Sequence, residues 1–251
     1  MSAGVLGNVV AAPEVYAPEV LEAIDRGRGR SQIAQPSTNL TTGYDVWHCY
    51  ELSWLLNSGE VRYATGALII PASSPNTVES KSLKLYLNSL NAHTFTSDAD
   101  AVACIERDLS GLTEANVKLE LQTFEALQKS SCLVEAVEPF TAADQPAKRF
   151  KSVGFRSLCP VTSQPDWATL VIDVSETQFD AEVIGNCIES LRNHQGFHEQ
   201  CVEDLYSRLE RALEPDSLQV VGFFQRRGGI DITPWRSSTE TTPSVTRLFE
   251  Q

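Results

Sequence analysis

The chain has 251 residues, 42% hydrophobic and 21% charged, which is the composition of a soluble globular protein with one large or two small domains. Its net charge of −13 repels phosphate backbones and argues against a direct nucleic-acid ligand. No apolar run is long enough to span a membrane, and the N-terminus lacks the basic region of a signal peptide. We therefore expect a cytoplasmic protein with no membrane or direct nucleic-acid partner.

Residues 1–42 are rich in Pro, Gly, Ser and Thr, which predicts an N-terminal arm with little regular structure. The arm contains RGRGR at 26–30. This basic stretch fits a solvated turn, the commoner case, or a phosphate contact.

The first half of the remaining chain predicts strands and helices in alternation. VRYATGALII (61–70) is typical of a strand, and SLKLYLNSLN (82–91) is typical of a helix. Asp98 is a candidate N-cap for a second helix, and VKLELQTF (117–124) alternates like a half-buried strand. The apolar stripe of that second helix consists of Val102, Ile105, Leu109 and Leu112.

The second half repeats this order after a polar linker at 135–150. ATLVIDV (168–174) predicts a strand, two helices follow at about 180–193 and 198–213, and LQVVGFFQ (218–225) predicts the closing strand.

Short matches between the halves support a duplication. SLNAH (89–93) matches SLRNH (190–194), and CIE (104–106) matches CVE (201–203). Two related modules, at 43–134 and 151–251, are the simplest explanation, and chance is the alternative. We expect an α+β fold in which each module is an antiparallel sheet with two helices on one face.

The six cysteines show neither CxxC spacing nor a zinc-binding pattern with histidine. One of them, Cys159, lies in SLCPVTSQPDW (157–167), seven residues before Asp166. No histidine lies within thirty residues of it, which argues against a Cys–His hydrolase. A turn through the two prolines would bring the acid back toward the thiol as a proton donor. The alternative is that Asp166 caps a turn and Cys159 belongs to the core.

Two glutamates and a basic turn are further candidates for binding residues. Glu79 precedes a predicted helix, and Glu199 follows His198 at the start of another, where a helix-dipole role is the alternative. A carboxylate at each place could accept hydrogen bonds from a purine-like ring. RRGGID (226–231) could bind phosphate or form an ordinary hairpin turn.

Together these motifs resemble those of the NADPH-dependent 7-cyano-7-deazaguanine reductases, the nitrile reductases of queuosine biosynthesis, in their longer two-module form. The resemblance covers residues 36–251, and its ordered motifs are YDVWHCYELSWL (44–55), ESKSLKLYLNS (79–89), LCPVTSQPDW (158–167), FHEQCVE (197–203) and RRGGIDITPWRS (226–237). It implies a tandem tunnelling fold (T-fold), a homodimer, and NADPH as co-substrate, two per turnover, with no metal.

The resemblance also implies roles for individual residues. Cys159 would add to the nitrile carbon to form a thioimide, and Asp166 would protonate the nitrile nitrogen. The residues implied in ring binding are Val78, Glu79, Ser80, His198 and Glu199. The residues implied in NADPH binding are Ser80, Lys81, Arg227 and Gly228, with Arg226 and Arg236 as further phosphate candidates. His48 and Cys49 are interpreted as structural.

Two other functions remain as rivals on the same fold. A zinc-dependent cyclohydrolase would need a Cys/His metal set, which the sequence does not assemble. A catalytically silent purine- or pterin-binding T-fold protein would keep the glutamates but would need neither Cys159 nor Asp166.

Overall fold

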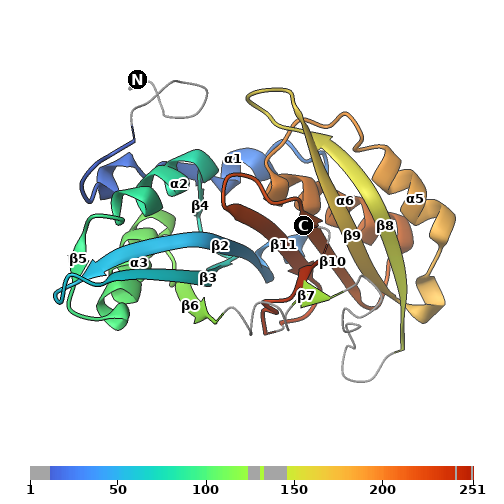
Figure 1. Ribbon diagram of the computed structural model, residues 1–251. Coiled ribbons are helices and arrows are strands. Elements are labelled where there is room, and N and C mark those ends of the chain that lie inside the picture. Colours follow the sequence, from blue (N-terminus) through green and yellow to red (C-terminus); the bar gives the residue numbers. More distant parts are fainter. Residues whose placement is uncertain (1–11, 124–130, 133–145, 241, 250) are drawn as a thin grey trace.

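In a computed structural model, residues 12–123, 131–132, 146–240, 242–249 and 251 are described. Within them the fold is α+β, with an eight-stranded sheet whose helices lie on one face (Figure 1). Seven strands run antiparallel in the order β6-β3-β2-β11-β10-β9-β8, and β5 pairs with β2 in parallel. The strands are β2 (Gly43–Leu56), β3 (Val61–Pro71), β5 (Thr94–Phe95), β6 (Lys118–Gln122), β8 (Ala147–Leu158), β9 (Pro165–Ser175), β10 (Leu218–Phe224) and β11 (Ile230–Ser237).

Two hydrophobic cores lie between this sheet and two pairs of helices. The first pair is α2 (Ser80–Ser89) and α3 (Asp98–Thr113), whose Leu83 and Ile105 pack with Leu68 of β3. The second pair is α5 (Ala181–Glu189) and α6 (His198–Leu213), whose Ile184 and Leu205 pack with strands β8 to β10. Each half is thus an antiparallel sheet with two helices on one face, as the sequence predicts.

The repeated strings occupy equivalent places in the two halves. SLNAH and SLRNH follow the first helix of each half, and CIE and CVE lie in the second helix. The halves join where β11 pairs antiparallel with β2, from Gly43 opposite Arg236 to Cys49 opposite Ile230. One sheet therefore runs through both modules.

The N-terminal region lies along the helices and contributes a strand pairing. Strand β1 (Ala23–Asp25) pairs with β4 (Asn76–Val78), and helix α1 (Arg26–Arg30) follows directly. The remaining short elements are η1 (Pro18–Val20), η2 (Thr38–Thr41), η4 (Glu176–Gln178), and β7 (Ser131–Cys132) paired with β12 (Arg247–Leu248). No helix in these described ranges is both long and apolar enough to cross a membrane.

Several local predictions need correction. Ser97, not Asp98, caps α3, because the Ser97 hydroxyl accepts from the Asp100 backbone N–H. Strand β10 does not close the sheet, since β11 follows it. Helix α5 ends at Glu189 rather than near 193, and β8 begins at Ala147, inside the stretch predicted as linker. Residues 135–145 of that stretch lie outside the described residues.

The RGRGR stretch forms the short helix α1 rather than a solvated turn, and only Arg28 of its three arginines is exposed. Arg26 is buried and pairs with Asp45 of β2, and Arg30 pairs with Glu203 of α6 at 2.7 Å. The two arginines fix α1 against both modules because each reaches a buried carboxylate.

Candidate functional site

A tight hairpin loop places Cys159 and Asp166 near each other. Strands β8 and β9 pair up to Leu158 opposite Pro165, and Asp166 lies opposite Ser157. The Cys159 backbone N–H donates to the Gln164 carbonyl at 2.8 Å, and the Ser163 N–H donates to the Cys159 carbonyl at 3.0 Å. Cys159 is therefore the first residue of a closed loop, and Asp166 lies just after the loop ends, on the paired strand.

A cavity of about 230 Å³ opens beside this loop, between the two modules. It collects most of the residues that the sequence singles out, and adds some that it does not. Those predicted are Val78, Glu79, Ser80, Cys159, Asp166, His198, Glu199 and Arg227. Those missed include Trp47, Thr77, Lys84, Phe197 and Gln225. Lys81 and Gly228 do not line it.

The Asp166 carboxyl, with the residue only 6% exposed, faces a cation and an imidazole. Arg227 Nη1 lies 3.0 Å from Oδ1, and His198 Nε2 lies 3.5 Å from Oδ2. The His198 ring stacks on Phe224 with centroids 4.1 Å apart, which holds the imidazole in place. His198 is thus placed to donate a proton to Asp166.

The two glutamates have different surroundings. Glu79 is the N-cap of α2, and its carboxylate accepts from the backbone N–H groups of Lys81 and Ser82 at 2.9 and 2.7 Å. The Glu199 carboxyl accepts only a 3.3 Å bond from Thr77 among the hydrogen bonds between described side chains. Burial, with the nearby Asp45 charge, raises the pKa of Glu199 despite Arg26 and His198. A buried carboxylate with one side-chain donor and its own backbone N–H as partners can still accept from a ligand that brings N–H groups.

A basic rim borders the same cavity and fits a phosphate-bearing cofactor. Burial lowers the pKa of Lys84, and the neighbouring Arg227 lowers it further, against Glu79 and Glu51. Gly228 and Gly229 have positive φ, and a Cβ on Gly228 would lie 3.3 Å from Lys84 Nζ. Two cations that repel one another beside a close glycine turn would be relieved by an anion between them. Lys84 could have been found from its place three residues after Lys81, one helical turn along α2.

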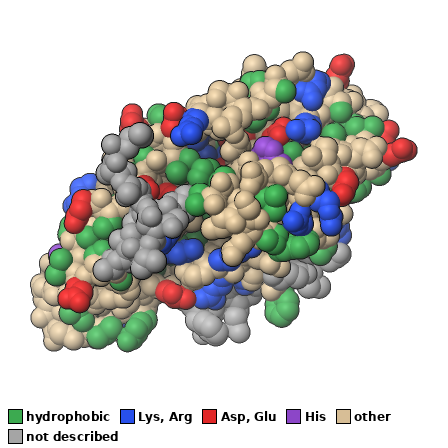
Figure 2. Space-filling view, turned by 90° about the horizontal axis from the view of Figure 1, so that it is seen from above, with side chains coloured by type: hydrophobic (Ala, Val, Ile, Leu, Met, Phe, Trp, Pro, Cys, Tyr) green, Lys and Arg blue, Asp and Glu red, His purple; other side chains and the backbone are tan. Residues whose placement is uncertain are grey.

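Arg236 is not a phosphate ligand, contrary to the prediction. Its guanidinium is completely buried and pairs with Asp45 at 2.8 Å and with Glu203 at 2.9 Å. Arg226, in contrast, lies over the Tyr50 ring and 3.4 Å from Glu51 at the surface. Figure 2 shows Lys and Arg side chains at several separate places on the face seen from above, with Asp and Glu side chains among them.

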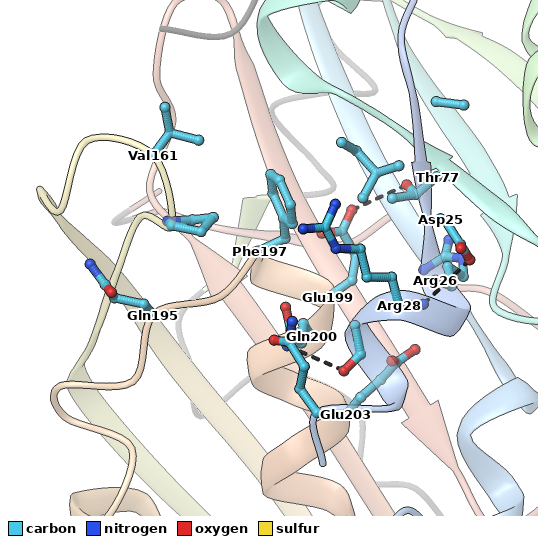
Figure 3. Close-up of a pocket in the computed structure, with 15 residues that line it drawn as sticks. Asp25, Arg26, Arg28, Thr77, Val161, Gln195, Phe197, Glu199, Gln200 and Glu203 are labelled. Carbon is cyan, nitrogen blue, oxygen red and sulfur yellow. Dashed lines mark hydrogen bonds between the residues drawn. The ribbon is translucent and has the colours of Figure 1, made fainter. Parts of the chain in front are cut away.

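A second cavity of about 440 Å³ adjoins the first and lies between α1 and the start of α6 (Figure 3). The two cavities share Thr77, Pro160, Phe197 and Glu199. Cys159 faces one cavity while the next residue, Pro160, faces both. The shared wall therefore brings Glu199 within reach of ligands on either side.

His48 and Cys49 lie away from both cavities. His48 Nδ1 is 2.8 Å from Asp231, its Nε2 is 2.9 Å from the Val245 carbonyl, and Cys49 belongs to the first core. Their interpretation as structural residues agrees with these contacts. No three His, Cys, Asp or Glu side chains within the described ranges are placed to hold a metal ion.

Comparison with known proteins gives a consistent result for both halves of the chain. A family model described as "Nitrile reductase, 7-cyano-7-deazaguanine-reductase N-term" matches residues 12–121, and one described as "QueF-like protein" matches 165–243. An NADPH-dependent 7-cyano-7-deazaguanine reductase of Acinetobacter baylyi is 37% identical over 98% of this chain and 97% of its own length. One of Acinetobacter baumannii (strain SDF) is 38% identical with the same coverage.

Among solved structures, the apo form of an archaeosine synthase QueF-Like covers 39% of this chain and 96% of its own, with 19% identity and a TM-score of 0.34. Family membership rests on the sequence matches, which extend over both modules. The chain belongs to the family of NADPH-dependent 7-cyano-7-deazaguanine reductases.

Proposed function

We propose that this protein reduces the nitrile of 7-cyano-7-deazaguanine to the primary amine of 7-aminomethyl-7-deazaguanine, with NADPH as reductant. The observation that carries the proposal is a cavity that joins a half-exposed thiol, a buried acid and two buried glutamates. The names of the relatives point to the same substrate and cofactor.

Cys159 and Asp166 would perform the first step together. The thiolate sulfur forms a bond to the nitrile carbon, one C≡N π bond breaks, and the nitrogen takes a proton from Asp166, which gives a thioimide. His198 can restore that proton because its ring faces the same carboxyl. The loop geometry supports these roles, since it holds thiol and acid at one sheet edge.

NADPH would supply hydride to the carbon, first at the thioimide and, after the C–S bond has broken, at the imine. A nitrile needs four electrons to become an amine, which requires two NADPH and two protons per turnover. The residues we assign to NADPH are Ser80, Lys81, Arg227 and Gly228. We add Lys84 to them because it lines the same cavity and lies close to Gly228. Arg227 would then serve both the phosphates and Asp166.

We assign ring binding to Glu79, Glu199 and His198, with the backbone of Val78 and Ser80. The pyrimidine part of a deazaguanine presents N–H donors that match the carboxylate of Glu199. The place of this reaction would be queuosine biosynthesis in the cytoplasm, where cysteine stays reduced. We also infer a homodimer, because β6 and β8 stand at the two ends of the strand order and can pair with a second copy.

The test is an intact-mass spectrum of the protein with 7-cyano-7-deazaguanine and no NADPH. We expect a mass gain equal to the whole ligand, since addition to the nitrile expels nothing. Cys159→Ala should lose the gain, and Cys187→Ala, which alters another partly exposed cysteine, should keep it. Binding without any gain in the unaltered protein would instead indicate the silent purine-binding protein and overturn the catalytic roles.

A further inference from the structure

Helix α1 carries three arginines, and two of them are fully engaged. Arg26 pairs with Asp45 and bonds to Ser74, while Arg30 pairs with Glu203 and donates to the carbonyls of Leu40 and Ala72. The Arg28 side chain has no ion pair or hydrogen bond with any described residue. Figure 3 shows it extending from α1 into the second cavity. One guanidinium thus faces a cavity with its donors available.

The charge of this cavity argues against the cofactor as the ligand of Arg28. Asp25, Glu199 and Glu203 line it against only Arg26 and Arg28, whereas Lys84 and Arg227 lie at the other cavity. A molecule with several phosphates would be repelled here. The remaining walls include Ile24, Pro160, Val161 and Phe197, which suit a flat, neutral ring.

The position of Arg28 is set by contacts of its own helix. The Asp25 carboxylate caps α1 by accepting from the backbone N–H groups of Gly27 and Arg28 at 2.7 and 3.4 Å. Gln200 of α6 donates to the Gly29 carbonyl at 3.3 Å and to the Gln32 side chain at 2.9 Å. Since Gln200 follows Glu199, these bonds fix the position of α1, and so of Arg28, relative to Glu199.

We propose that Arg28 recognises the ring carbonyl oxygen of the substrate and so selects oxo-purine-like rings, an inference that rests on the proposed function. In such a ring the carbonyl is adjacent to the N–H that would donate to Glu199. The carbonyl also lies between that N–H and the carbon that bears the nitrile. A ligand with its N–H at Glu199 and its nitrile at Cys159 therefore presents its carbonyl to the wall that the two cavities share, which Arg28 faces from the second cavity. Arg28 supplies the donor that this oxygen needs once water has been displaced.

The test measures dissociation constants by calorimetry in the Cys159→Ala protein, so that binding stays non-covalent. The two ligands are 7-cyano-7-deazaguanine and its thiocarbonyl analogue, which keeps the N–H donors but offers sulfur, a weak acceptor. With Arg28 present, the oxo ligand should bind about tenfold more tightly than the thio analogue. Arg28→Leu should bring that ratio to within about twofold of unity by weakening mainly the oxo ligand.

Arg211→Leu is the matched control, because it removes an exposed arginine from the last turn of α6 and should leave both constants unchanged. An unchanged ratio in Arg28→Leu, or weaker NADPH binding with normal ring binding, would overturn the proposal. The two hypotheses fail separately. Absence of the Cys159 adduct removes the proposed function, whereas these titrations use no nucleophile and test Arg28 alone.

Discussion

At the scale of single residues, the surroundings of each cysteine decide whether its thiol can react. Among the cysteines whose side chains the structure describes, Cys49, Cys104 and Cys201 are buried. Burial raises the pKa of Cys201 to about 12, which keeps that thiol protonated and unreactive at neutral pH. Cys159 differs because it starts a loop at the edge of a cavity. The sequence pointed to it through its prolines and its aspartate rather than through a neighbouring base.

Replacement of the acid tests its role without altering its shape. Asp166→Asn should slow adduct formation with 7-cyano-7-deazaguanine by about 100-fold, because an amide cannot protonate the nitrile nitrogen. The rate is measured by rapid quenching and mass spectrometry at saturating ligand. An unchanged rate in Asp166→Asn would remove Asp166 as the acid and leave His198 as the next candidate, since it lies 3.5 Å away.

Ring binding should depend on pH through Glu199. Its pKa is raised by burial, so the accepting carboxylate is present above that raised pKa and is lost as pH falls through it. We expect the dissociation constant of the ring in the Cys159→Ala protein to rise on acidification from pH 8 to pH 5. Glu199→Gln should weaken binding by about 1–3 kcal/mol at neutral pH and flatten the profile. An equally steep profile in Glu199→Gln would assign the titration to another group, such as His198.

At the scale of elements, periodicity predicted most helices and strands but not the residues at which they begin and end. The core stripe of α3 is evident in its sequence, yet the choice between Ser97 and Asp98 as N-cap depends on one local hydrogen bond. The structure of the N-terminal arm was harder to predict, because three arginines alternating with two glycines at 26–30 are typical of a solvent-exposed segment. Only the fold shows that Arg26 pairs with Asp45 and that Arg30 pairs with Glu203.

The buried ion pairs that fasten α1, β2, β11 and α6 make a further prediction. Burial would raise the pKa of Asp45, but attraction to Arg236 and Arg26 outweighs it and holds this pKa below its usual range. Arg236→Met should cost about 3–5 kcal/mol of unfolding free energy at pH 7, because Asp45 and Glu203 each lose a buried partner. Urea unfolding measures the loss, with Arg211→Met as an exposed control. A cost near zero would show that Arg26 and Arg30 suffice.

At the scale of the whole molecule, the sequence predicted two modules but not the seam between them. The matches between 89–93 and 190–194 mark the repeat, and in each half a second long helix, α3 or α6, follows the matched string. The pairing of β2 with β11 leaves no such trace, because alternation along a strand does not specify its neighbour. The first cavity lies beside that seam, lined by Trp47 of β2 and Ile230 of β11, so its lining residues were predictable in kind and not in arrangement.

That seam also has a consequence for the order in which the protein is made. Residues 43–49 leave the ribosome well before their partners at 230–236, with most of both modules made in between. Strand β2 therefore carries an unpaired edge until β11 has been made, and pairing of such distant segments is intrinsically slow. Glu79 and Cys159 belong to different halves, and a chain that stops short of β11 lacks the strand that joins those halves in one sheet.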